Sequence, residues 1–131
     1  MATRAEYEAS ICKGLRDAKP VPFKQVSHGD WRPEVGECHR NVDEWVAAHQ
    51  GTAPVRGWVT IGSSGVTTRL TAHSVVRDAD GQLMDITPLE NEYYRVSMRF
   101  VPHIGDDQTF FAMKNAWNEI DCPEEAATGV A

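Results

Sequence analysis

The middle of the chain has the two-residue period of β-strands and is divided by two glycine-containing turns. The segments VRGWVTI (55–61), RLTAHSVVRD (69–78) and QLMDIT (82–87) are rich in β-branched residues, and GSSG and ADG separate them. Connections this short join antiparallel neighbours, because parallel strands need a crossover of a dozen or more residues. The pattern therefore predicts an antiparallel meander, and any fold of this chain must be built around it.

A fourth strand is predicted over residues 93–101, YYRVSMRFV, where apolar and polar side chains alternate. The apolar face would carry Tyr94, Val96, Met98 and Phe100, and the solvated face would carry Arg95, Ser97 and Arg99.

Helical spacing marks three segments outside this sheet. Residues 4–18 carry an apolar stripe that ends before the prolines of KPVP. Residues 38–49 repeat apolar side chains at intervals of three and four, and the glycine at position 51 follows as a helix C-cap would. The DDQ of 106–108 is an N-cap signal for a last helix.

The predicted fold class is therefore α+β. It consists of a mostly antiparallel four-stranded sheet packed with an N-terminal, a central and a C-terminal helix. The length of 131 residues suits a single domain, which we place at 1–121, and residues 122–131 have the composition of a flexible tail.

Composition and charge exclude several classes of partner. The net charge is −6, and no run of Lys or Arg forms a basic stripe, so we expect no binding to nucleic acid. The longest apolar stretches are a few residues long, so we expect no membrane span. The first ten residues resemble no signal peptide, which predicts a cytoplasmic location.

The three cysteines, Cys12, Cys38 and Cys122, are odd in number and widely spaced. This spacing does not form a disulfide framework, so each is interpreted as a free thiol. Cys38 differs from the others because it lies at the predicted start of the central helix. There it is either a small buried hydrophobe on the stripe with Val42, or a thiolate stabilised by the helix N-terminus. Gly36 would let a substrate backbone approach.

A nucleophilic cysteine needs a base, and the best candidate lies in the hairpin that contains His73 and Asp85. A two-residue Asp80–Gly81 turn would place these two side chains on opposite faces. A three-residue loop with Gly81 in the left-handed region would pair residue 75 with 85 and residue 73 with 87. His73 and Asp85 would then be diagonal neighbours on one face, within reach of a hydrogen bond. That face also carries Val75 and Leu83, which we expect to pack under the central helix and bring Cys38 over His73.

The order of these residues resembles the catalytic core of transglutaminase-like and related papain-like thiol enzymes: a Cys at a helix start, a His on the following strand and an Asp on the next strand, within DITP. The resemblance covers Gly36 to Pro88 and implies one papain/transglutaminase-like domain. In that family the cysteine attacks an amide or ester carbonyl, the histidine takes and returns the proton, and the aspartate holds the imidazole. The resemblance assigns these roles to Cys38, His73 and Asp85.

The sequence departs from the family pattern near the cysteine. Papain-type enzymes carry a glutamine shortly before it as an oxyanion donor, whereas this chain reads WRPEVGE. The backbone N–H of Cys38 is then the first candidate donor. Further candidates for the oxyanion hole or the substrate cleft are Gln25, His28, Trp31, Gly36 and His103, although both histidines also fit a solvated or turn-bonded role. His39 is expected to point about 100° away around the helix, toward solvent or the loop.

Three classes of function follow from these residues. The first is a thiol-dependent acyl hydrolase or transferase that acts on a peptide or protein amide, at a peptide bond or a glutamine side chain, without a cofactor. The second is a catalytically silent binding module on the same fold. The third is a metal site made of Cys38, His73 and Asp85, which is the least favoured because the chain has neither C-x-x-C nor H-E-x-x-H.

Overall fold

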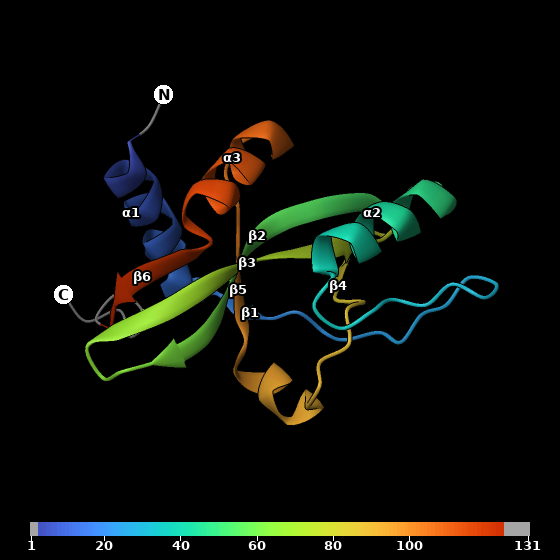
Figure 1. The fold of residues 1–131 in the computed structure, drawn as a ribbon, viewed down its shortest axis with the longest axis horizontal. Coiled ribbons are helices and arrows are strands. Elements are labelled where there is room, and N and C mark those ends of the chain that lie inside the picture. Colours follow the sequence, from blue (N-terminus) through green and yellow to red (C-terminus); the bar gives the residue numbers. More distant parts are fainter. Residues whose placement is uncertain (1–2, 125–131) are drawn as a thin grey trace.

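A computed structural model describes residues 3–124, which form an antiparallel sheet with helices packed against it (Figure 1). The elements in chain order are α1 (Arg4–Gly14), η1 (Leu15–Asp17), β1 (Lys19–Pro20), α2 (Cys38–Ala48), β2 (Ala53–Ser63), β3 (Thr67–Arg77), β4 (Leu83–Met84), η2 (Glu92–Ser97), β5 (Arg99–Pro102), α3 (Asp107–Trp117) and β6 (Glu119–Pro123). The α+β class is confirmed, but the sheet has six strands where four were predicted.

The long hairpin of β2 and β3 is the centre of the sheet. On one side β2 pairs with β5, which in turn pairs with β1, and all of these pairings are antiparallel. The far edge of β3 is shared by two strands, because β6 pairs with residues 67–71 and β4 with residues 76–77. Among the described residues, positions 72–75 of β3 therefore have no strand partner on that edge.

Two apolar layers cover the sheet, one on each face. One face packs against the helices: Trp58 and Leu70 lie under α1 and α3, and Val76 lies under Val42 of α2. The other face buries Val75 with Phe100 of β5 and with residues of the adjoining loops. Most of the buried core residues thus lie on the helix-covered face.

The predicted fourth strand is wrong over most of its length. Residues 92–97 form the 3-10 helix η2, and the strand begins only at Arg99. Val96, expected to be buried, is 79% exposed, whereas Arg95, expected to face solvent, is 8% exposed. Two polar interactions favour the 3-10 helix over the strand that the alternation predicts. Asn91 caps η2 by accepting a hydrogen bond from Tyr93 N at 3.0 Å, and Arg95 forms a buried ion pair with Asp85.

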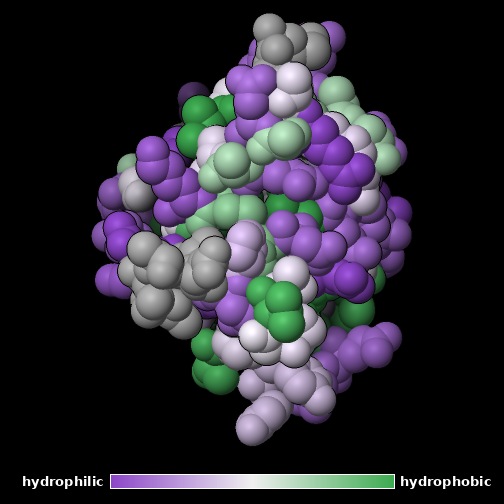
Figure 2. All heavy atoms as spheres, turned by 90° about the vertical axis from the view of Figure 1, so that its left-hand side faces the viewer, coloured by the Kyte–Doolittle hydropathy of each residue, from purple (hydrophilic) through white to green (hydrophobic). Residues whose placement is uncertain are grey.

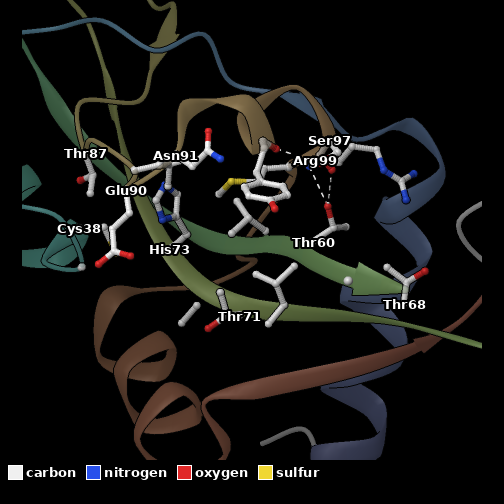
Figure 3. Close-up of a pocket in the computed structure, with 18 of the residues that line it drawn as sticks. Cys38, Thr60, Thr68, Thr71, His73, Thr87, Glu90, Asn91, Ser97 and Arg99 are labelled. Atoms are coloured by element: carbon white, nitrogen blue, oxygen red, sulfur yellow. Dashed lines mark hydrogen bonds between the residues drawn. The ribbon is translucent and has the colours of Figure 1, made fainter. Parts of the chain in front are cut away.

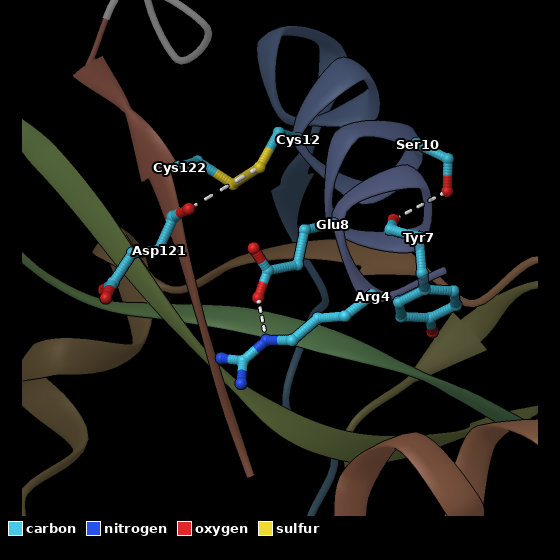
Figure 4. The surroundings of a disulfide bond; sticks show 7 residues. All are labelled: Arg4, Tyr7, Glu8, Ser10, Cys12, Asp121 and Cys122. Carbon is cyan, nitrogen blue, oxygen red and sulfur yellow. Dashed lines mark hydrogen bonds and ion pairs between the residues drawn. A yellow bond between two sulfur atoms is a disulfide. The ribbon is translucent and has the colours of Figure 1, made fainter. Parts of the chain in front are cut away.

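A disulfide joins Cys12 of α1 to Cys122 of β6, two residues 110 positions apart (Figure 4). Interpreting these two cysteines as free thiols was therefore wrong, and Cys38 is the free cysteine. Their pairing depends on β6 lying beside β3 under α1, which spacing along the chain does not reveal. Disulfides persist mainly in oxidising compartments. The expectation of a cytoplasmic location did not take this bond into account.

The expected tail is only partly described. Cys122 and Pro123 belong to β6, so the tail does not begin at residue 122 as predicted, and residues 125–131 lie outside the described part.

The surface over α1 and β6 is mainly hydrophilic, with apolar residues in small separate patches (Figure 2). Among the helices of residues 3–124, none combines the length and the apolar character needed to cross a membrane.

Candidate active site

Cys38 is the first residue of α2, and the chain before it is held in place by Asn41. The side chain of Asn41 donates to Glu34 O at 2.8 Å and accepts from Glu34 N at 3.0 Å. Gly36 has φ of 79°, a left-handed conformation that favours glycine, and so turns the chain into the helix. The side chain of Glu37 makes no capping hydrogen bond, so the first backbone N–H groups of α2 have no side-chain cap.

The hairpin after β3 has the loop that the sequence predicts. Asp78 N donates to Gln82 O at 2.8 Å, which closes a loop of three residues, and Gly81 has φ of 85°. His73 and Asp85 then lie on one face, and His73 Nε2 donates to Asp85 Oδ2 at 2.7 Å. The three-residue loop and the contact between the two side chains agree with the prediction. The ladder has the predicted register at Val76–Met84 and Arg77–Leu83, but it ends before the expected pairs 75–85 and 73–87.

The position of α2 relative to this pair differs from the prediction. Val75 and Leu83 pack against Val21 and Phe100 on the face away from α2, because α2 lies on the opposite face over Val76. The first turn of α2 instead lies at the edge of β3, where residues 72–75 lack a strand partner in the described part. Cys38 reaches His73 around this edge.

His39 is also placed differently from the prediction, because it faces the protein interior. Its Nδ1 atom lies 2.6 Å from Ser74 Oγ, and its ring makes edge-on contacts with Phe110 and Phe111 at centroid distances of 5.7 and 5.5 Å. The 100° rotation from Cys38 is correct. This rotation directs the His39 ring toward α3, because α3 covers that side of the sheet. The position of α3 relative to the central helix could not be predicted from the sequence pattern.

The thiol of Cys38 is made acidic by the two imidazoles. Burial raises the pKa of the thiol, but hydrogen bonds from His39 and His73, together with their positive charge, outweigh burial and lower it to about 6. A thiol with this pKa is mostly thiolate at neutral pH. A cysteine that served only as a small buried hydrophobe would have a raised thiol pKa, because burial disfavours the thiolate.

His73 is held in its charged form by the groups on either side of it. Burial lowers the pKa of this imidazole, but the hydrogen bond to Asp85, the hydrogen bond to Cys38 and the negative charges of both partners raise it to about 10. The thiolate and the imidazolium stabilise each other, so between the two pKa values the pair exists as an ion pair.

Arg95 is a member of the site that sequence reasoning missed. Its Nη1 atom donates to the same Oδ2 of Asp85 at 2.8 Å, its Nη2 atom donates to Thr87 O at 2.8 Å, and Glu92 accepts from it at the other side. Its guanidinium also stacks on Phe23, 4.4 Å from the ring centroid. The sequence gives little sign of this role: Arg95 stands on the solvated face of the predicted strand over 93–101, and the structure forms η2 there instead.

A cavity of about 890 Å³ opens beside the Cys38–His73 pair. It runs between the β2–β3 hairpin and η2, and Figure 3 shows Cys38 and His73 toward one end and Thr68 and Arg99 toward the other. Gly36 lines the end that holds Cys38, as the sequence argument expected.

The other four cleft candidates do not line this cavity. His28 packs on His49 on the outer side of α2, with ring centroids 5.2 Å apart, and Gln25 is exposed in the same loop. Trp31 packs on Trp45 with centroids 6.2 Å apart.

His103, the fourth of these candidates, lies near α1 and α3. Its Nδ1 atom shares a hydrogen bond of 2.6 Å with the hydroxyl of Tyr7, and its Nε2 atom donates to Asp106 O at 3.0 Å. It is therefore part of the packing between α1 and α3 and does not contribute to the cavity.

Within residues 3–124, no three side chains of His, Cys, Asp or Glu are grouped so that they could hold a metal ion. Cys38, His73 and Asp85 form a chain with the imidazole in the middle, and Asp85 is already occupied by Arg95. This arrangement suits proton transfer better than metal ligation.

Comparisons of the chain with protein-family models, with curated proteins and with solved structures found no match. The likeness to transglutaminase-like and papain-like enzymes thus rests on the residues between Gly36 and Pro88.

Proposed function

We propose that this protein is a thiol-dependent acyl hydrolase or transferase that acts on amides through an acyl-enzyme on Cys38. The observation that carries the proposal is the ordered contact of three groups. A thiol with a pKa of about 6 lies at a helix start beside His73, and Asp85 holds that imidazole at 2.7 Å. A base that is itself oriented by a third group is the arrangement that activates a nucleophile.

Hydrogen bonding divides the two nitrogens of His73 between different tasks. Asp85 occupies Nε2, so Nδ1 is the nitrogen that remains for proton exchange at the sulfur and at the substrate. Asp85 in turn keeps its orientation because Thr87 N donates to its Oδ1 at 3.1 Å and Arg95 donates to its Oδ2. The imidazole therefore cannot rotate without breaking a buried hydrogen bond.

In the acylation step the Cys38 thiolate attacks the amide carbonyl carbon, and the C=O electron pair moves to oxygen. When the tetrahedral intermediate collapses, the C–N bond breaks and the His73 imidazolium gives its proton to the leaving nitrogen. Water or an amine then attacks the thioester, His73 takes the proton of that nucleophile, and the thiolate leaves. Hydrolysis, deamidation and transamidation share the first half and differ in the leaving group and the acceptor.

The developing oxyanion needs hydrogen-bond donors. The uncapped N-terminus of α2 offers the backbone N–H of Cys38, and the positive end of the helix dipole adds to it.

The cavity has the size of a site for an extended substrate segment, because ligand cavities are commonly about 300–1,000 Å³. Its contact surface is mostly apolar, with threonines from both strands of the central hairpin. We propose that the acyl part of a peptide or protein amide lies in it, with the scissile carbonyl at Cys38.

The proposal is tested with a pool of peptides from a digested proteome. The pool is incubated with the wild-type protein and with Cys38→Ala, and the products are compared by mass spectrometry, with and without an added primary amine. New termini indicate proteolysis, conversion of glutamine to glutamate indicates deamidation, and incorporated amine indicates transfer. If no product depends on Cys38, and no acyl adduct forms on the intact wild-type protein, the proposal is wrong.

A further inference from the structure

His39, the residue after Cys38, is the second imidazole whose hydrogen bonding lowers the pKa of the Cys38 thiol, and its ring is held on the opposite face of the sheet from His73. His73 reaches Cys38 from one face of the sheet, whereas His39 lies on the other face beside Ser74. His39 does not line the substrate cavity. Its role therefore concerns the thiol and not the substrate.

The orientation of His39 is fixed by a chain of hydrogen bonds that begins at Arg56. Arg56 Nη1 donates to Ser74 Oγ at 2.9 Å, and Ser74 Oγ lies 2.6 Å from His39 Nδ1. Ser74 is fully buried and Arg56 is 6% exposed, so water does not compete for these groups.

The chain also determines which nitrogen of His39 carries the proton in the neutral ring. A guanidinium only donates, so Ser74 Oγ must accept from Arg56. If His39 Nδ1 also donated to Ser74, the buried hydroxyl would have no acceptor for its own hydrogen, which costs about 1–3 kcal/mol. The hydroxyl hydrogen therefore goes to Nδ1, and Nε2 carries the ring proton.

We propose that His39 is a dedicated hydrogen-bond donor to the Cys38 thiolate, positioned through Ser74 by Arg56, and that it does not act as the base. The inference deepens the proposed function and rests on it for its catalytic meaning. Nε2 keeps its hydrogen in both the neutral and the protonated ring, so His39 donates in either state. His73 has the reverse arrangement. Its Nε2 donates to the Asp85 carboxylate, so its Nδ1 remains for proton exchange.

The groups behind the two imidazoles differ in hydrogen-bonding character. Behind Ser74 lies the positive charge of Arg56, which is shared with Asp43 at 2.5 Å and with Asp107 at 3.3 Å. Behind His73 lies the carboxylate of Asp85, which is paired with Arg95. Because Arg56 and Asp85 are each balanced by partners of opposite charge, the division of roles rests on the groups that contact the rings: a hydroxyl that gives its hydrogen to His39 Nδ1, and a carboxylate that accepts from His73 Nε2.

The first test is made on the wild-type protein and needs no substrate. Long-range ¹H–¹⁵N correlation spectra distinguish protonated from unprotonated ring nitrogens. Over the pH range in which the His39 ring is neutral, we expect an unprotonated Nδ1 and a protonated Nε2. A neutral ring with its proton on Nδ1 would overturn the inference.

The second test follows the rate of Cys38 alkylation by iodoacetamide as a function of pH. His39→Ala should move the midpoint upward by about one to two pH units, the size of one hydrogen bond to a charged group. His39→Gln keeps an N–H donor and should recover part of this shift, and Ser74→Ala should move the midpoint more than Ser74→Thr. The matched control is His28→Ala, which removes an exposed histidine outside the site and should leave the midpoint unchanged.

A midpoint that stays at the wild-type value in folded His39→Ala would contradict the inference. Because neither test involves a substrate, the two proposals can fail separately. A protein that passes both tests and forms no Cys38-dependent product keeps the His39 donor and loses the proposed function. A protein that forms such a product but fails these tests loses only the inference.

Discussion

His73 and Arg95 share one oxygen atom, Oδ2 of Asp85, at 2.7 and 2.8 Å. The aspartate that orients the imidazole is thus itself oriented by a buried guanidinium, and the three side chains form one unit that links β3, the segment after β4 and η2. The sharing couples the two partners: loss of Asp85 removes the hydrogen bond to His73 directly, whereas loss of Arg95 leaves that carboxylate buried without its guanidinium.

The ion pair of Cys38 and His73 predicts the pH dependence of thiol reactivity. The thiolate is the reactive species, so the alkylation rate of Cys38 should be half-maximal near pH 6, should stay flat at neutral pH, and should fall as the pH drops below the pKa of the thiol. Rates with iodoacetamide, followed by peptide mapping, measure this. In His73→Ala the midpoint should rise toward the value of an ordinary thiol, about 8.5. A wild-type midpoint near that value would return Cys38 to a structural role.

Asp85→Asn should slow turnover by several orders of magnitude while the fold is nearly retained, as in serine triads. The amide no longer stabilises the imidazolium, so the alkylation midpoint of Cys38 should also rise. Thermal unfolding monitored by circular dichroism separates the two effects. Unfolding of the variant without any change in the reactivity of its folded fraction would show that Asp85 is only the structural partner of Thr87 N and Arg95.

Arg95→Met should destabilise the protein by about 3 kcal/mol, because it leaves the buried carboxylate of Asp85 without its guanidinium partner. The measurement is the free energy of unfolding in urea. Arg99→Met is the matched control: Arg99 is only half-buried and donates to one carbonyl, Leu15 O at 3.3 Å, so its replacement should cost less than about 1 kcal/mol. Equal costs for the two variants would contradict a buried role for Arg95.

Gly57 lies directly opposite His73 in the β2–β3 hairpin and has no room for a side chain. A Cβ atom there would contact the carbonyl oxygen of Val101 and lie 2.6 Å from Cζ of Phe100. Gly57→Ala should therefore cost about 1–3 kcal/mol of unfolding free energy, since the backbone must shift. Gly62→Ala, on the same strand with no atom within 4 Å of the new Cβ, should be nearly neutral. A neutral Gly57→Ala would mean that β5 does not pack here as described.

The disulfide predicts both a thiol count and a stability difference. Protein purified without reductant should have one thiol that reacts with Ellman's reagent in the native state, Cys38. The double variant Cys12→Ser, Cys122→Ser should unfold at a lower urea concentration, with a loss of about 5 kcal/mol for a closed loop of this length. Three reactive thiols after denaturation without reductant would show that the bond is absent.

The sequence by itself determined the features that depend on neighbouring residues. The capping residue Asp106, the helix start at Cys38 and the three-residue loop with Gly81 all follow from local conformational preferences. The loop length was sufficient to place His73 and Asp85 on one face, because the side-chain period of a strand is two.

Tertiary structure decided the features that depend on segments distant in the chain. The alternation over 93–98 indicated a strand, but a buried ion pair between Arg95 and Asp85 turned that segment into η2. The direction of His39 depended on Ser74, 35 residues away, and the bond between Cys12 and Cys122 on a separation of 110. Local patterns set which way a side chain points relative to its own element. Only the packing of elements sets what that side chain meets there, because burial and long-range hydrogen bonds outweigh local preference.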